Sequence, residues 1–382
     1  YADLLLPATG WGEKYGTVTN SERCISRVMP AIAAPGEARH DWQIVVDFAR
    51  ALGKKLDHAA AERLFPYGDA EAIFNEHRAS TRGRDLDISG LSYALLERDG
   101  PQQWPYPEGA TSGKVRLYED AVFPTADGKA RFVAIEHLPT ADTLSSAAPI
   151  SLLSGRMRDH WHGMSRTGTV PRLFNLEDEP LLAMHPCDMR HRSLDSGDLV
   201  RVSNPRGEMN VRVAERPGLQ KGRAWMPMHW GSQFMNSPGA NAVASDAIDP
   251  YSKQPELKHA AVQITKLDLP YPLAIIRRCP DQESALELMQ RARAALPRFA
   301  YATLNLYGRS SPLVVFRASS AEAVAADLLQ EMDVLFGIDG AEGAIVFADA
   351  KRHIAKKAIS IEGRLLGVRL AGETLAQTWL KQ

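Results

Sequence analysis

Apolar residues recur with two different spacings along this chain, and each spacing predicts a different kind of element. Between residues 41 and 53 they recur every three or four positions, which predicts an amphipathic helix that ends at Gly53. The apolar stripe of this helix is formed by Trp42, Val45, Ala49 and Leu52, with Ile44 and Phe48 beside it. We therefore expect residues 1–56 to be the end of an α/β layer.

Residues 57–147 have a less regular pattern. Short helices are expected over about 70–79 and 90–98, separated by loops that contain Gly and Pro. Around Asp127 and Gly128 the sequence predicts a hairpin that joins strands at 121–123 and 130–135. We expect this stretch to connect two more regular parts of the chain.

Residues 148–267 carry short apolar runs separated by glycine-containing turns. Many short strands joined by tight turns favour a closed barrel. The expected strands lie at 150–153, 199–203, 209–214, 224–228 and 261–264.

After a break at Pro270–Pro272 the pattern changes to alternating strands and helices. We expect residues 273–382 to form a separate α+β domain that folds largely on its own. Its expected strands lie at 273–276, 299–305, 312–317, 344–347, 358–361 and 366–370, and its helices at 284–296 and 321–335. The fold class is therefore mixed α/β and β.

Composition excludes several classes of protein. The net charge of -1 gives no whole-chain reason to bind nucleic acid or an anionic membrane, and no apolar run approaches the length of a membrane span. Cys24, Cys187 and Cys279 lie far apart, which fits neither a disulfide scaffold nor an iron–sulfur or zinc site and suits reduced thiols in a cytosolic protein. The chain begins at Tyr1 inside an apolar run, with no initiator Met and no signal-peptide pattern, so we expect further sequence upstream.

The stretch Ser154–Thr167 is the most informative part of the chain. It follows a strand-like run and packs Gly155, Arg156, Arg158 and a His-Trp-His triplet into a few residues. Such charged and polar residues are seldom buried in a hydrophobic core. They are suited to binding a large, flat, polyanionic ligand, because arginine pairs with phosphate oxygens and an indole ring can stack on a flat group. The alternative for this segment alone is a surface loop with an incidental His-x-His pattern.

This stretch resembles the dinucleotide-binding domain of molybdopterin oxidoreductases of the dimethyl-sulfoxide-reductase type. Other blocks, in the order and spacing of that family, extend the resemblance over about residues 1–267. These blocks are Leu6–Lys14, Thr19–Arg23, Ala34–Trp42, Arg223–Trp230 and Asp249–Lys258. The resemblance implies a double-psi-type barrel over residues 148–267 and a cofactor of molybdenum with two molybdopterin guanine dinucleotides.

The resemblance also implies roles for residues within the histidine stretch. His160, Trp161 and His162 would hydrogen-bond to and pack around a pyrophosphate and pterin, without binding metal. Ser154, Gly155 and Arg156 begin the same segment, and Ser165 and Thr167 would supply hydroxyl donors.

Five cofactor contacts are implied elsewhere in the chain. Lys14 would contact a phosphate or pterin oxygen, although a solvated loop lysine is the simpler interpretation. Asp41 would accept paired N–H groups from a guanine or pterin edge, or would cap the helix that follows it. Asn241 and Lys258 would offer an amide and a charge, and both would otherwise be ordinary surface residues. Trp230 would form an apolar wall beside the pterin, or be a core aromatic.

By resemblance the chain is the carboxy-terminal part of a cytoplasmic assimilatory nitrate reductase catalytic subunit, which reduces nitrate to nitrite. The metal-ligating residue and the cysteines of a 4Fe-4S cluster would lie upstream of Tyr1, so this chain alone is expected to be inactive. Ferredoxin, flavodoxin and an NADH-dependent reductase subunit all remain possible electron donors, with neither nucleic acid nor membrane as a partner. The alternatives are a formate dehydrogenase of the same family and a cofactor-free scaffold or interaction module.

Overall fold

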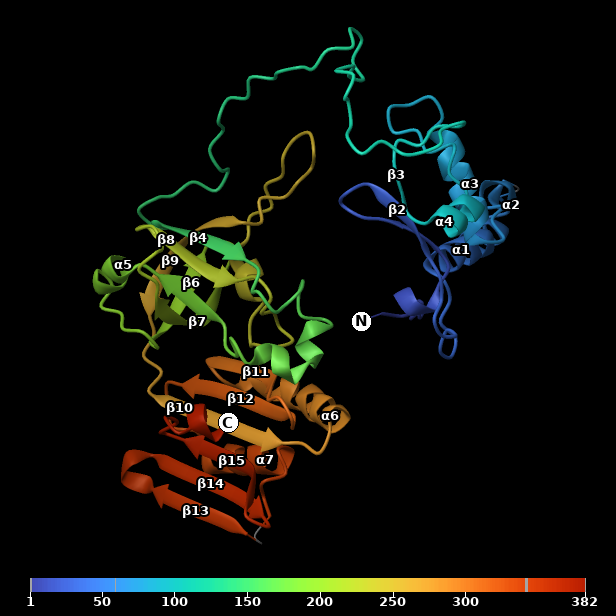
Figure 1. Ribbon diagram of the computed structural model, residues 1–382. Coiled ribbons are helices and arrows are strands. Elements are labelled where there is room, and N and C mark those ends of the chain that lie inside the picture. Colours follow the sequence, from blue (N-terminus) through green and yellow to red (C-terminus); the bar gives the residue numbers. More distant parts are fainter. Residues whose placement is uncertain (1, 59, 341–342, 382) are drawn as a thin grey trace. The chain divides into compact units, whose positions relative to one another are not determined.

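The computed structural model describes residues 2–58, 60–340 and 343–381. The chain divides into two compact units, Tyr1–Glu136 and His137–Gln382 (Figure 1). Within the described residues, no helix combines the length and the apolar character needed to cross a membrane.

The first unit is a small antiparallel sheet with helices around it. The sheet has the order β1-β2-β3. Its core is built from β2, α3, α4 and the segment that ends at Tyr106, and includes Ile25, Phe74, Leu91 and Leu96. The elements are β1 Gly16–Thr19, β2 Cys24–Val28, β3 Gln102–Gln103, α1 Asp41–Lys55, α2 Ala61–Leu64, α3 Ala70–Ser80, α4 Tyr93–Asp99 and the 3-10 turn η1 Trp11–Glu13.

Helix α1 differs from its prediction at both ends. His40 is the N-cap residue and Asp41 is the first residue inside the helix, so the expectation that Asp41 caps it is wrong. The helix continues two residues past Gly53. Within its predicted apolar stripe Val45 is 58% and Leu52 is 42% exposed, and the neighbouring Phe48 is 58% exposed, whereas the buried apolar side chain of α1 is that of Val46, outside the stripe.

The expected hairpin around Gly128 is wrong as well. A tight turn does form, in which the Phe123 N–H donates to the Gly128 carbonyl at 2.9 Å, but residues 121–135 form no strand. Phe132 is 98% exposed and Ile135 is 88% exposed. An isolated two-stranded ribbon is marginal in water, and the described residues of this unit leave Val122, Phe132 and Ile135 exposed.

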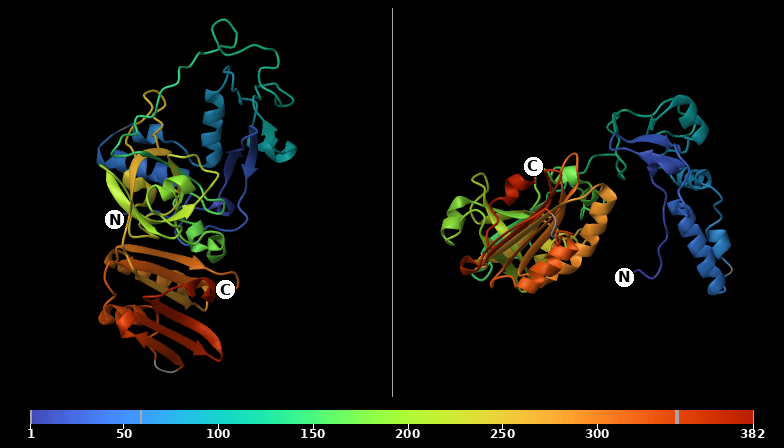
Figure 2. Two further views of the ribbon diagram at one scale, coloured as in Figure 1. Left: turned by 90° about the vertical axis from the view of Figure 1, so that its left-hand side faces the viewer. Right: turned by 90° about the horizontal axis from the view of Figure 1, so that it is seen from below.

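Six strands of the second unit close into a barrel in the order β4-β8-β5-β7-β6-β9 (Figures 1 and 2). The pairs β4·β8 and β5·β7 are parallel, whereas the other pairs are antiparallel. The closed barrel and all five expected strands are present. The strands are β4 Ile150–Gly155, β5 Leu181–Met184, β6 Leu199–Asn204, β7 Gly207–Glu215, β8 Arg223–Pro227 and β9 His259–Lys266.

The barrel core is apolar, and the sequence did not indicate one of its strands. Leu182 and Met184 of β5 are fully buried beside Val200, Val211 and Met226. Short elements between the strands are η2 Thr167–Thr169, η3 Pro171–Phe174, α5 Pro186–Arg190 and η4 Gly239–Val243.

The remaining strands form an antiparallel six-stranded sheet in the order β11-β12-β10-β15-β14-β13. Helices α6 and α7 lie along one of its faces (Figure 2), and α8 packs its Leu380 on the other. The strands are β10 Tyr271–Arg278, β11 Tyr301–Tyr307, β12 Leu313–Ser320, β13 Ala344–Asp349, β14 Ile354–Ile361 and β15 Arg364–Ala371. The helices are α6 Gln282–Ala292, α7 Ala326–Leu335 and α8 Gln377–Leu380, with 3-10 turns η5 Arg293–Arg298 and η6 Ala350–Arg352. Helix α7 begins five residues later than expected.

The sheet and the barrel loops share one hydrophobic core. Phe174, Trp230 and Phe234 come from the barrel region, and they cluster with residues of β10, β11, β12 and α6. Backbone bonds reinforce this contact, because the Leu304 N–H of β11 donates to the Phe234 carbonyl at 2.8 Å. The expectation that residues 273–382 fold independently is therefore at odds with the structure, in which the two parts form one compact unit.

Candidate functional site

The carboxyl ends of the parallel strands β4 and β8 bring together residues that are distant in the sequence. The Met228 N–H donates to the Gly155 carbonyl at 2.9 Å, which holds the two strand ends side by side. The Ser154 hydroxyl donates to the Leu257 carbonyl at 2.9 Å, and the Lys258 ammonium lies 3.4 Å from the Met228 sulfur. Ser154 thus anchors the segment that carries Lys258 to this end of the barrel. We call this region, which consists of the loop after β4 (residues 156–167), residues 228–230 and Lys258, the barrel end.

A buried histidine that we did not select from the sequence fixes the loop after β4. His229 is 1% exposed, and its Nε2 accepts the Met157 N–H at 2.9 Å. Its Nδ1 bonds to the His162 carbonyl, so we assign the proton to Nδ1 and the neutral form to the ring. Burial, together with the nearby charges of Arg156 and Lys258, lowers the pKa of His229. In the sequence, the only indication of His229 was its place in the Met-His-Trp run at 228–230. That run does not show that the ring bonds to Met157 and His162.

His160 lies inside the protein, contrary to the expected direct contact with a ligand. It is 3% exposed, its Nδ1 lies 3.1 Å from the Thr167 hydroxyl oxygen, and its ring packs at 4.6 Å on that of Phe174. The same hydroxyl oxygen accepts the Trp161 N–H at 3.3 Å. His160 and Thr167 therefore hold the loop in shape, and the predicted hydroxyl donor of Thr167 is already engaged.

The outer face of the same loop is exposed and cationic. The Arg156 guanidinium lies 4.2 Å from the centre of the Trp161 ring, and Trp161 is 54% exposed. The ring of His162 meets that of Trp161 edge-on at 4.9 Å. Arg156 and Lys258 are both cations, and both lie close enough to lower the pKa of His229. A flat stacking surface beside clustered positive charge suits a phosphate-bearing aromatic ligand.

Two predicted contacts have a different role in the structure. A Cβ at Gly155 would lie 2.8 Å from the indole nitrogen of Trp225, so this glycine admits a neighbouring side chain and not a ligand. Trp230 is fully buried and packs edge-on against Phe174 and Phe234 at 6.1 and 6.2 Å. The expected apolar wall beside a pterin is thus wrong for Trp230, and the alternative of a core aromatic describes it.

Asn241 and Ser165 are exposed, as a ligand contact requires. Asn241 lies in η4, which is tied to the barrel because the Asn204 side-chain amide donates to the Val243 carbonyl at 2.9 Å. Among the described residues, no hydrogen bond joins Asn241 or Ser165 to the barrel end. Nor do three His, Cys, Asp or Glu side chains come together as metal ligands in that part of the chain.

In the first unit, the two predicted cofactor contacts pair with each other. The Lys14 ammonium lies 2.7 Å from a carboxylate oxygen of Asp41 and 4.8 Å from the centre of the Trp11 ring. The hydrogen bond from Lys14 lowers the pKa of Asp41. Because the side chain of Asp41 is 64% exposed, the pair stabilises the fold little and can open for a ligand.

Stability is expected to fall as the pH drops through the range in which His160 titrates. Burial lowers the pKa of His160 from 6.5 to about 4, so the unfolded chain takes up this proton before the folded chain does. The contribution of His160 is fully present above pH 6.5 and is lost progressively as the pH falls to about 4. Urea unfolding from about pH 7 to about pH 4.5 measures the slope. His160→Asn should flatten it, and an unchanged slope in that variant would rule out His160 as the source.

Each of the two units contains a region that matches a protein-family model. The model of the molydopterin dinucleotide binding domain matches residues 150–261, and that of molybdopterin oxidoreductase matches residues 1–51. A nitrate reductase of Klebsiella oxytoca is 38% identical over 274 residues, which is 69% of this chain and 30% of that protein. The assimilatory nitrate reductase catalytic subunit of Bacillus subtilis is 35% identical over 266 residues, covering 69% of this chain and 36% of its own.

Formate dehydrogenases are similar as well. The F420-dependent formate dehydrogenase subunit alpha of Methanocaldococcus jannaschii is 33% identical over 266 residues, covering 70% of this chain and 37% of its own. Among solved structures, acetylene hydratase from Pelobacter acetylenicus covers 68% of this chain and 37% of its own, with 17% identity and a TM-score of 0.45, which does not establish a shared fold. This chain spans about a third of the length of the curated relatives named here.

Proposed function

We propose that this chain, which carries domains of the molybdopterin oxidoreductase and molydopterin dinucleotide-binding families, is the carboxy-terminal part of a molybdenum-dependent nitrate reductase. The premise of the proposal is that the chain is homologous to nitrate reductase catalytic subunits. The observation that carries the proposal is the cationic barrel end, where Arg156 lies over the exposed ring of Trp161 and Lys258 lies against Met228. Its ligand is a molybdopterin guanine dinucleotide.

The residues of the barrel end fit such a group by charge and shape. Arg156 and Lys258 pair with pyrophosphate oxygens, and Trp161 stacks on a flat ring. His162 and Ser165 stand on the same exposed loop as further donors, and Asn241 offers an amide to a pterin edge. The guanidinium that now covers Trp161 would turn toward the phosphates when the ligand binds.

The other residues hold this surface in place. His229 and Ser154 fix the loop after β4 and the segment before Lys258, so the charged groups are positioned before the ligand arrives. In the first unit, Lys14 and Asp41 exchange their mutual ion pair for contacts with the cofactor. The bound group supplies the redox chemistry of molybdenum, and these residues supply binding and orientation.

The finer assignments are also proposals. The barrel is of the double-psi type, which its two parallel strand pairs support, with residues 57–147 connecting it to the α/β part. Nitrate is the substrate and the reduction is assimilatory, as the name of the Bacillus subtilis relative suggests, and the protein acts in the cytoplasm. The molybdenum ligand and a 4Fe-4S cluster would be held by residues that are not among these 382, and ferredoxin, flavodoxin or an NADH-dependent reductase subunit would supply the electrons.

Formate dehydrogenase is the second candidate, because the relative from Methanocaldococcus jannaschii matches 70% of this chain, against 69% for the two nitrate reductases. An assay of the complete protein separates the two. Reduced viologen should be consumed with nitrate, whereas oxidised viologen with formate should give no reaction. Formate oxidation without nitrate reduction would contradict the proposal, and a protein that lacks both activities and the cofactor would be the scaffold of the third hypothesis.

A further inference from the structure

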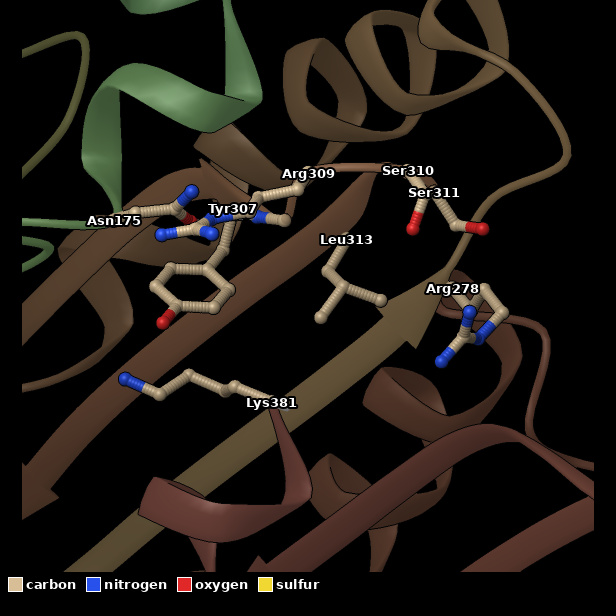
Figure 3. A pocket seen from close by; sticks show the side chains of 9 residues that line it. Asn175, Arg278, Tyr307, Arg309, Ser310, Ser311, Leu313 and Lys381 are labelled. Carbon is tan, nitrogen blue, oxygen red and sulfur yellow. Dashed lines mark hydrogen bonds between the residues drawn. The ribbon is translucent and has the colours of Figure 1, made fainter.

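A cationic pocket lies in the carboxy-terminal sheet, and none of its lining residues belongs to the barrel end. Its cavity of about 380 Å³ opens beside the loop between β11 and β12 (Figure 3). In Figure 3, Leu313 lies at the middle of the pocket, with Arg278 on one side and Lys381 on the other. The polar residues of the wall are Asn175, Arg278, Tyr307, Arg309, Ser310, Ser311 and Lys381. None of these lining residues carries a carboxylate.

The wall presents hydrogen-bond donors and positive charge to the cavity. Arg278 and Arg309 are exposed and, within the described residues, neither side chain has a hydrogen bond or an ion pair. The side-chain amide oxygen of Asn175 accepts the Gly308 N–H at 3.3 Å, which leaves the NH₂ group of the same amide able to donate. The hydroxyls of Ser310 and Ser311 can donate as well.

Lys381 adds charge that its neighbours do not fully neutralise. Its side chain is 10% exposed, with the ammonium 2.5 Å from a carboxylate oxygen of Asp178 and 4.9 Å from the centre of the Tyr307 ring. Asp178 also pairs with the buried Arg317. These ion pairs extend to Glu179, which pairs with Arg212 and Arg317. The linked group therefore contains three cations and two carboxylates, namely Arg212, Arg317, Lys381, Asp178 and Glu179. This group therefore carries one positive charge in excess, and Lys381 is the member of it that lines the pocket.

An apolar cavity of about 220 Å³ adjoins the cationic one. Arg278 and Leu313 line both cavities, and the second is otherwise lined by apolar groups that include Ile276, Val368 and the 64% exposed Trp379. A ligand that spans both would carry an anionic head and an apolar or aromatic body.

We propose that these adjoining cavities bind a small phosphate ester, with the phosphate in the cavity that Arg278, Arg309 and Lys381 line and the organic group against Trp379. Two arginines and a lysine match a doubly charged tetrahedral group better than a singly charged planar one such as nitrate, and guanidinium pairs with phosphate in a bidentate way. The combined cavities are large enough for a mononucleotide. This site is separate from the cofactor surface proposed above and does not depend on it.

Calorimetric titration of the purified full chain at low salt tests the proposal with three probes: inorganic phosphate, nitrate and adenosine monophosphate. We expect saturable phosphate binding, much weaker nitrate binding, and roughly tenfold tighter binding of the nucleotide than of phosphate. Arg278→Gln and Arg309→Gln should each weaken phosphate binding by roughly tenfold. Arg216→Gln, which alters an exposed barrel arginine outside the pocket, should change nothing.

The organic half of the site has its own variant. Trp379→Ala should remove the advantage of the nucleotide and leave phosphate binding intact. The proposal is wrong if the wild-type chain shows no saturable phosphate binding, or if both arginine variants bind phosphate and the nucleotide as well as the wild type. Equal affinity for nitrate and phosphate would overturn the assignment to phosphate esters.

Discussion

A chain truncated after Leu269 is expected to lose the ordered histidine loop, although the barrel strands keep a core of their own. The truncation removes the sheet against which Met164, Phe174, Trp230, Phe234 and Met235 pack, all of them at most 2% exposed. Exposing one such side chain costs about 1.5–3 kcal/mol, so five together reach the roughly 5–15 kcal/mol by which a whole domain is stable. Since His160 rests on Phe174, the loop should become mobile and cofactor binding should be lost with it.

Hydrogen exchange followed by mass spectrometry measures this directly. Amides of residues 156–176 and 228–236 should exchange quickly in the truncated chain, while those of β6 and β7 stay protected. Leu375→Ala, at an 85% exposed position of the full-length chain, serves as the control and should leave protection unchanged. If the loop stays protected after truncation, residues 270–382 are not its support.

His229→Ala is expected to destabilise the protein by about 3–5 kcal/mol. The substitution leaves the Met157 N–H and the His162 carbonyl without their buried partner and opens a cavity, and each unsatisfied group costs about 1–3 kcal/mol. Thermal and urea unfolding measure the loss, and cofactor retention should fall because the loop is no longer held.

His162→Ala is the matched comparison, because it keeps the carbonyl that His229 bonds and removes only an exposed ring. Its stability should change by less than about 1 kcal/mol, while cofactor binding weakens by about 1–3 kcal/mol through the loss of a hydrogen-bond partner. Equal unfolding curves for His229→Ala and the wild type would show that His229 does not lock the loop. Full cofactor retention in His162→Ala would remove His162 from the binding surface.

Local patterns predicted most of the second unit, because its strands alternate or run apolar between glycine turns. The five expected barrel strands and all strands of the final sheet are present. Strand β5 was missed because Leu181–Met184 is short and has no glycine turn beside it. The predicted hairpin at 121–135 is wrong although its pattern of apolar and polar residues is typical of strands. Such a pattern does not form a stable two-stranded sheet unless its apolar side packs against another part of the protein.

The candidate site was only partly predictable, since the sequence shows which residues are present but not which way they face. Arg156, Trp161, His162 and Lys258 stand on the surface as a ligand contact requires. In contrast, His160 and Trp230, which have equally suitable chemistry, turn inward and pack against Phe174.

Long-range pairing explains what else was missed. The partners of His229 lie 72 and 67 positions away in the sequence. Lys14, in the loop after η1, pairs with Asp41 at the start of α1, 27 positions further on. Nothing local distinguishes such a buried, doubly bonded histidine from a surface one. Independent folding of residues 273–382 was a similar error, because the apolar residues that join the sheet to the barrel loops come from separate stretches of sequence.

Mass spectrometry of the small molecules released by denaturing the purified chain tests the central claim most directly. The protein should be produced in cells supplied with molybdenum and purified without added nucleotide. The account predicts guanine nucleotide and pterin in stoichiometric amounts, and predicts that both fall in Lys258→Gln while Arg216→Gln retains them. A folded wild-type chain that releases neither guanine nor pterin would contradict it.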